Sequence, residues 1–83
     1  MIKLTSQEIV ALNREYTFFS WSVQSQTAPI PMVKAEGIYF WDADGKRYLD
    51  FSSQLMNMNI GHQHPKVVKA IQDQAATLSF AHP

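Results

Sequence analysis

The sequence contains no cysteine, which excludes disulfides, thiolate nucleophiles and cysteine-ligated zinc. It has only three glycines and four prolines, and it carries no repeat or low-complexity tract. No apolar run approaches the roughly 18 residues of a membrane-spanning helix. Polar Ser6, Gln7 and Glu8 stand where a signal peptide would have its apolar core. We therefore expect no membrane partner and a cytoplasmic location.

An excess of one charge is also missing, because seven Lys and Arg balance seven Asp and Glu. Neither sign clusters along the chain, so we expect no nucleic-acid partner. With 83 residues the chain forms at most one small domain. Its aromatic fraction of 12%, including Trp21 and Trp41, is high for this length. We expect some of these rings to pack against surfaces outside this chain.

Two amphipathic helices are predicted, one near each end of the chain. Thr5 and Glu8 have the spacing of a capping box, which places a helix start directly after Thr5. Apolar residues follow at steps of three and four and predict a helix over about residues 6–19: Ile9, Leu12, Tyr16 and Phe19. Pro65 suits the first turn of a second helix over about residues 65–79. Its apolar face carries Val67, Val68, Ile71, Ala75 and Leu78.

The segment between these helices predicts a small antiparallel sheet. Residues 20–31 are polar and contain Pro29 and Pro31, which indicates a loop. Strands are expected within about residues 32–51, where Asp42-Ala43-Asp44-Gly45 suits a hairpin turn closed by a left-handed glycine. Residues 52–64 mix polar and apolar side chains and predict a structured loop pressed against a surface. The fold class is therefore α+β.

Several motifs have simpler explanations than a catalytic or metal site. Asp42-x-Asp44-Gly45 resembles the start of a calcium loop, but Lys46 follows and no glutamate occupies the twelfth position, so we interpret it as a turn. His62 and His64 lie at a helix entrance, which favours turn and cap roles over metal binding. Gly61 permits unusual backbone geometry, although a glycine beside a helix N-terminus could also hold a phosphate. No nucleophile, base and oxyanion hole come together.

Three ordered segments together resemble one known family. They are Ala35-Glu36-Gly37-Ile38-Tyr39, then Trp41-Asp42-x-Asp44-Gly45-Lys46-x-Tyr48-x-Asp50-Phe51, then Asn59-x-Gly61-His62-x-His64-Pro65-x-Val67. Their order and spacing, from about Trp21 to Leu78, are similar to the class III aminotransferases, which use pyridoxal phosphate on the fold-type-I scaffold. The stretch from Phe19 to Gln24, followed by Pro29-Ile30-Pro31, is most similar to the branch that acts on ω-amino acids and amines, of the taurine and β-alanine type.

The resemblance implies an N-terminal helix, a small sheet and a second helix, all in the minor domain of a homodimeric enzyme. It implies transfer of an amino group between an amine or ω-amino acid and a 2-oxo acid. Leu55 and Met56 correspond to a wall of the substrate pocket, and Trp21 to an aromatic residue at its entrance. An aliphatic wall disfavours a substrate with an aromatic or strongly charged distal group.

The resemblance also implies that the Schiff-base lysine and the phosphate-binding residues lie downstream of this segment. The chain alone should therefore be inactive, bind no pyridoxal phosphate and expose enough apolar surface to self-associate. Two alternatives remain open: a non-catalytic binding module, and a pyridoxal phosphate enzyme of another kind, such as an aminomutase or racemase, on the same scaffold.

Overall fold

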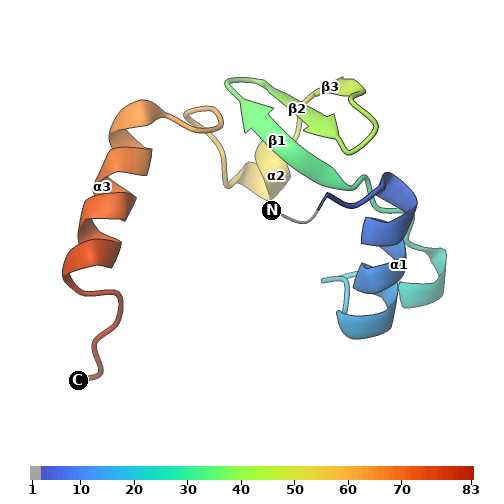
Figure 1. The fold of residues 1–83 in the computed structure, drawn as a ribbon, viewed down its shortest axis with the longest axis horizontal. Coiled ribbons are helices and arrows are strands. Elements are labelled where there is room, and N and C mark those ends of the chain that lie inside the picture. Colours follow the sequence, from blue (N-terminus) through green and yellow to red (C-terminus); the bar gives the residue numbers. More distant parts are fainter. Residues whose placement is uncertain (1–2) are drawn as a thin grey trace.

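The computed structural model describes residues 3–83 and has the predicted α+β class. A three-stranded sheet lies between two long helices, α1 at one end of the molecule and α3 at the other (Figure 1). In chain order the elements are α1 (Ser6–Tyr16), the 3₁₀ turn η1 (Gln24–Gln26), β1 (Met32–Glu36), β2 (Tyr39–Asp42), β3 (Arg47–Leu49), α2 (Ser53–Met56) and α3 (Pro65–Thr77).

The sheet is an antiparallel meander with β2 in the centre. Tyr39 of β2 lies opposite Glu36 of β1, and Phe40 lies opposite Tyr48 of β3. The rings of Phe40 and Tyr48 are stacked, with centroids 5.0 Å apart. Phe40 is the one hydrophobic side chain in residues 3–83 that is buried, so the sheet holds the small core of this chain.

The β2–β3 hairpin turn is organised by Asp42, and the predicted plain turn is confirmed. One carboxylate oxygen of Asp42 accepts hydrogen bonds from the amides of Asp44 and Lys46, at 3.0 and 2.9 Å. The other accepts the hydroxyl of Tyr48 at 2.9 Å. Gly45 has a φ of +86° and donates its amide to the carbonyl of Asp42, as a left-handed closing residue does. Both oxygens of this carboxylate are therefore occupied by donors from the same hairpin.

Helix α1 begins as predicted but ends earlier. The Thr5 hydroxyl accepts the amide of Glu8, and the Glu8 carboxylate accepts the amide of Thr5, which confirms the capping box. The helix ends at Tyr16, three residues before the predicted Phe19, because Thr17 adopts an extended conformation and its hydroxyl bonds back to the carbonyl of Asn13. The predicted helix end at residue 19 was therefore wrong.

Helix α3 begins at Pro65, as predicted, and His64 caps it by accepting the amide of Lys66 on Nδ1. It ends at Thr77, two residues before the predicted end at residue 79. Leu78 is extended, and its carbonyl accepts the side-chain amide of Gln74, which supports the chain beyond the last turn.

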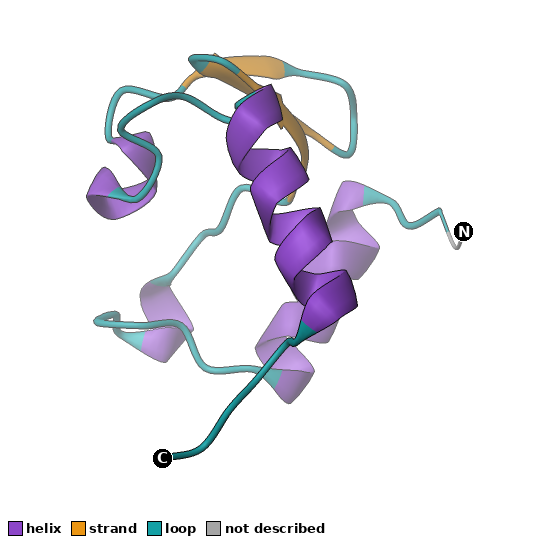
Figure 2. Ribbon diagram, turned by 90° about the vertical axis from the view of Figure 1, so that its left-hand side faces the viewer, coloured by secondary structure: helices purple, strands orange, loops and turns teal. Residues whose placement is uncertain are grey.

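The long helices make no extensive contact with the sheet in the described chain. Figure 2, viewed from the end that carries α3, shows this helix in front of the sheet and α1. Strand–strand packing supplies the extensive contacts, and α1 and α3 have no buried residue. The apolar face of α3 is open to solvent, with Ile71 63% exposed. Within residues 3–83 no helix is long and apolar enough to cross a bilayer.

Candidate functional site

The segment from residue 50 to residue 62 forms a loop whose two ends meet at the β1–β2 turn. At one end the amide of Asp50 donates to the carbonyl of Ile38 at 2.8 Å. At the other end His62 and Gly37 exchange two backbone hydrogen bonds, at 2.8 and 3.1 Å. Gly37 and Ile38 are neighbours, so one turn holds both ends of the loop. Compact loops with joined ends are frequently functional.

Side chains join the two ends as well. Nε2 of His62 lies 2.5 Å from an oxygen of Asp50, and these side chains are only 9% and 3% exposed. Gly61 allows the two backbones to lie close together beside this contact, because a Cβ at Gly61 would lie 3.3 Å from the carbonyl oxygen of Gly37. Gly61 also has a φ of +88°, which an L side chain rarely adopts. The tight approach and the left-handed backbone both favour a glycine at this crossing.

The loop carries α2, which is a single turn wound in the left-handed sense. Ser53, Gln54, Leu55 and Met56 all have φ values between 51° and 63°. The backbone is flanked by right-handed residues, Ser52 and Asn57. Left-handed helical geometry costs about 1–2 kcal/mol per non-glycine residue. Four such residues in sequence persist only where the surrounding structure determines them strongly.

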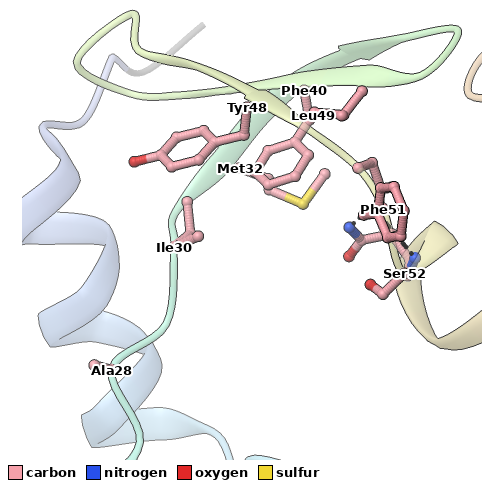
Figure 3. A pocket seen from close by; sticks show the side chains of 10 residues that line it. Ala28, Ile30, Met32, Phe40, Tyr48, Leu49, Phe51 and Ser52 are labelled. Atoms are coloured by element: carbon pink, nitrogen blue, oxygen red, sulfur yellow. Dashed lines mark hydrogen bonds between the residues drawn. The ribbon is translucent and has the colours of Figure 1, made fainter.

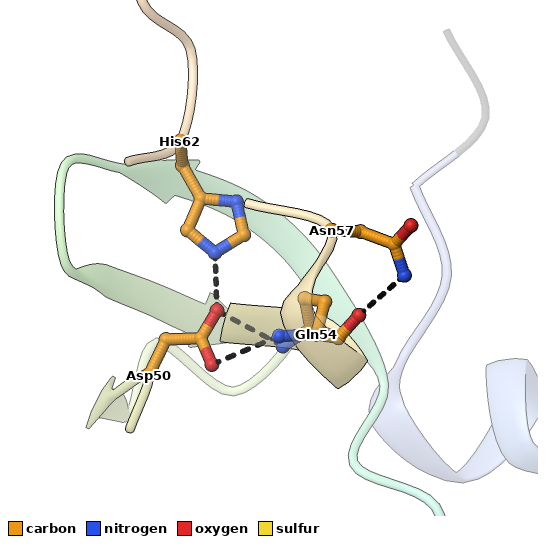
Figure 4. Close-up of polar contacts among 4 residues, drawn as sticks. All are labelled: Asp50, Gln54, Asn57 and His62. Carbon is orange, nitrogen blue, oxygen red and sulfur yellow. Dashed lines mark hydrogen bonds and ion pairs between the residues drawn. The ribbon is translucent and has the colours of Figure 1, made fainter. Parts of the chain in front are cut away.

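Asp50, Gln54, Asn57 and His62 form the contacts that surround this turn, and we call them the Asp50 network (Figure 4). Asp50 accepts the side-chain amide of Gln54 at 3.1 Å and the Gln54 backbone amide at 3.4 Å. Asn57 donates to the carbonyls of Gln54 and Leu55, at 2.7 and 3.3 Å. The network therefore binds the turn from both of its ends.

The electrostatics of the network favour an ionised Asp50. The hydrogen bond from His62 lowers the pKa of this carboxyl below its ordinary value of 3.8, burial opposes that shift, and the hydrogen bonds from Gln54 reinforce it. Asp42 in the hairpin behaves similarly. Its burial raises the pKa, but hydrogen bonds from the Lys46 amide, the Tyr48 hydroxyl and the Asp44 amide outweigh burial and leave the pKa lowered.

An open hollow of about 560 Å³ lies between the sheet and the start of this loop (Figure 3). Phe40, Tyr48 and Met32 face it from the strands, and Phe51 and Ser52 lie at its other side. Phe51 is 93% exposed, so the hollow is a surface recess. Its lining is mixed: the strands contribute mostly apolar side chains together with the Tyr48 hydroxyl, and the loop adds Asp50, Ser52 and Gln54.

Trp21, Leu55 and Met56, which the family resemblance assigns to the substrate pocket, share one backbone property. All three have positive φ, and they account for half of the six non-glycine residues that do so in residues 3–83. Their side chains are 94%, 64% and 73% exposed. None of them lines the hollow described above. The structure joins Leu55 and Met56 on α2 and leaves Trp21 on a separate loop, where Gln24 bonds to the backbone of Phe19.

The prediction that residues 52–64 press against a surface holds only at the ends of the segment. His62 is largely buried, whereas Leu55, Met56 and Ile60 are exposed. The apolar side chains of the loop therefore have no covering surface within residues 3–83.

The lysines of the chain do not form a cofactor site. A lysine that forms a Schiff base is usually desolvated, and all five lysines here are exposed. Lys34 and Lys46 lie over aromatic rings at 4.8 and 4.9 Å, and Lys69 pairs with Asp73 on α3. Residues 3–83 therefore do not fit pyridoxal phosphate by themselves. Among the same residues, no cluster of three or more His, Asp or Glu side chains could hold a metal.

Sequence reasoning did not find the contact between Asp50 and His62. Both residues belong to the motifs that carry the family resemblance, but twelve positions separate them and no local periodicity joins them. A usable signal was Gly61, because a glycine there marks a place where another backbone approaches closely.

Residues 20–82 match the family model of the class III aminotransferases. The chain superposes over its full length on the crystal structure of a taurine:2-oxoglutarate aminotransferase from Bifidobacterium kashiwanohense, with a TM-score of 0.85 and 47% identity, and it covers 18% of that chain. The latter structure is a complex with pyridoxal phosphate and glutamate.

Two curated relatives are also similar to this chain in sequence. A probable mitochondrial ornithine aminotransferase of Caenorhabditis elegans is 37% identical over 93% of this chain, which covers 17% of that protein. A glutamate-1-semialdehyde 2,1-aminomutase of Herminiimonas arsenicoxydans is 51% identical over 63% of this chain, which covers 12% of it. The chain spans less than a fifth of the length of each of these proteins. The match over residues 20–82 establishes that the chain belongs to the class III aminotransferase family.

Proposed function

We propose that this chain is the N-terminal segment of a pyridoxal phosphate-dependent enzyme that moves an amino group between an ω-amino acid or amine and a 2-oxo acid. The carrying observation is the full-length superposition on the taurine:2-oxoglutarate aminotransferase, at 47% identity. In this proposal residues 1–83 belong to the minor domain of a homodimer.

The role proposed for the chain is to supply part of the substrate pocket. Leu55 and Met56 project from a left-handed turn, and Trp21 also has positive φ. Strained backbone of this kind clusters at active sites and ligand-binding segments. The exposure of these three side chains supports a role in contacts with a ligand or with other parts of the enzyme.

The cofactor would be held outside these residues, because the exposed lysines here do not fit it. Pyridoxal phosphate supplies the electron sink for amino-group transfer, while the protein supplies binding and orientation. The isolated chain is accordingly proposed to be inactive.

An aminomutase is the second candidate, and a specific observation favours it. The aminomutase relative is 51% identical over 53 residues of this chain. An aminomutase moves the amino group within one molecule and needs no 2-oxo acid, whereas a transaminase needs one as acceptor. This difference separates the two candidates in one assay.

The test uses the complete enzyme that contains this segment, loaded with pyridoxal phosphate. Taurine, β-alanine, 4-aminobutyrate and ornithine are supplied in turn with 2-oxoglutarate or pyruvate, and formation of glutamate or alanine is measured. The proposal predicts product with at least one donor, and no product when the 2-oxo acid is omitted. Conversion of glutamate-1-semialdehyde without any 2-oxo acid, and no transfer from the four donors, would instead establish the aminomutase.

A further inference from the structure

We infer that Asp50 and His62 are positioning residues for substrate selection, acting by holding the left-handed turn that presents Leu55 and Met56. This inference rests on the proposed function, because it assumes that these two side chains meet the substrate. The turn itself can be tested without that assumption.

The turn needs support from elsewhere in the chain. Its four residues are not glycines, yet all have positive φ. The backbone bonds within it are few: Met56 donates to the carbonyl of Ser52, and Asn57 and Met58 donate to that of Ser53. Such a short turn cannot select the left-handed form by local preference, since every L-residue in it favours the right-handed form.

Asp50 supplies that support because residues outside the turn hold both its backbone and its side chain in place. Its amide is bonded to Ile38, and its carboxylate is 3% exposed and bonded to His62. The same carboxylate takes both the backbone and the side-chain amide of Gln54. Gln54 is thereby tied to the sheet, and Leu55 and Met56 follow it directly in the chain.

His62 completes the arrangement from the other end of the loop. Its backbone is paired with Gly37, and its ring meets the Asp50 oxygen that also receives the Gln54 side chain. The side chains of Leu55 and Met56 are therefore placed by backbone bonds of the turn and by the contacts of Asp50 and His62 with its first half. A displacement of about 1 Å in an active site can cost about 100-fold in rate, so loosening these contacts should change substrate selection.

The test compares Asp50→Asn with Asp42→Asn in the complete enzyme. Asparagine keeps the shape of either aspartate but offers one oxygen where the carboxylate uses two. Both carboxylates are largely buried and accept backbone amides, but Asp50 bonds to α2 whereas Asp42 bonds within its own hairpin. Two quantities are measured: hydrogen exchange of the peptide over residues 52–60, and the ratio of kcat/KM for a short and a long ω-amino donor.

Asp50→Asn is expected to speed exchange of that peptide about 10-fold and to change the donor ratio about 10-fold. Asp42→Asn should lower the melting temperature and leave both quantities unchanged. His62→Gln provides a second variant, with the same expected result as Asp50→Asn, if Asp50→Asn does not fold.

A rescue experiment distinguishes this positioning role from a general structural one. Ser53→Gly removes a side chain from a left-handed residue, so it should restore slow exchange and the original donor ratio in the Asp50→Asn background. Ser52→Gly is the matched control, because Ser52 has a φ of −90° and gains nothing from glycine. Equal rescue by both glycines, or by neither, would overturn the inference.

The positioning role and the proposed function are contradicted by different results. Unchanged exchange in both Asp50→Asn and His62→Gln would overturn the positioning role whatever the enzyme catalyses. Faster exchange with an unchanged donor ratio would overturn the role in substrate selection. A wild-type enzyme with no amino transfer would overturn the proposed function, and exchange would still decide whether the network holds the turn.

Discussion

At the scale of single residues, the chain depends on two buried aspartates with different tasks. Asp42 organises a hairpin turn through groups within six positions of it, and Asp50 joins the two ends of a loop through His62. Both carboxyls have a lowered pKa, because the hydrogen bonds that they accept lower it by more than burial raises it. Asp42 therefore stabilises local structure, whereas Asp50 joins residues that are far apart in the sequence.

The lowered pKa of Asp50 predicts how stability depends on pH. The folded state favours the carboxylate, so Asp50 stabilises it above the ordinary pKa of 3.8, and this contribution is lost as the pH falls through the lower folded-state value. In the complete enzyme, urea unfolding of wild type and Asp50→Asn should differ most at neutral pH and converge below pH 3.8. A difference that grows as the pH falls would contradict the assignment.

Met56→Trp tests whether Met56 belongs to the substrate pocket of the complete enzyme. An indole there should change the preference between a short and a long amine by about 10- to 200-fold, as filling a pocket does. If Met56 is instead buried against another part of the enzyme, overpacking should cost about 1–3 kcal/mol of stability with preference unchanged. Measuring kcat/KM for both amines together with the melting temperature separates these outcomes.

At the scale of elements, the sequence predicted those parts of the fold that local chemistry determines. The capping box at Thr5, the turn at Gly45 and the helix start at Pro65 were all found, because each depends on residues within a few positions. The end of α1 was missed because apolar spacing continues to Phe19 while Thr17 is already extended. The left-handed α2 could not be predicted, since Asp50, the residue bonded to it from outside, is itself held by the distant Ile38 and His62.

The attachment of the loop to the sheet can be tested with two glycines of similar conformation. Gly45 and Gly61 have φ values of +86° and +88°, but only Gly61 has a backbone neighbour within reach of an added Cβ. Gly45→Ala should cost about 1–2 kcal/mol for the left-handed backbone alone. Gly61→Ala should cost about 1–3 kcal/mol more, because Gly37 must move. Urea unfolding of both variants gives the difference, and equal costs would show that the crossing tolerates a methyl group.

At the scale of the whole molecule, the described chain exposes far more surface than a monomer of its mass. Its accessible surface is 7386 Å², whereas a folded 9.5 kDa protein exposes about 5,000 Å². Its radius of gyration is 15.4 Å, against about 12 Å for a compact domain of this length. The excess comes with exposed apolar side chains on α3, α2 and the Trp21 loop. These apolar surfaces are suited to contact with another protein surface.

The isolated 83-residue chain should therefore associate with itself or bind a hydrophobic dye, because apolar patches beyond a few hundred Å² are unusual on soluble monomers. It should also retain no pyridoxal phosphate after dialysis, because a Schiff base on an exposed lysine hydrolyses freely. Sedimentation, dye fluorescence and visible absorbance after dialysis with the cofactor measure these properties. A compact monomer that binds no dye would contradict the covering of α3 and α2 by other parts of an enzyme. A cofactor absorbance that survives dialysis would show a reactive lysine within residues 1–83. It would contradict our proposal that the cofactor is held by residues outside this segment.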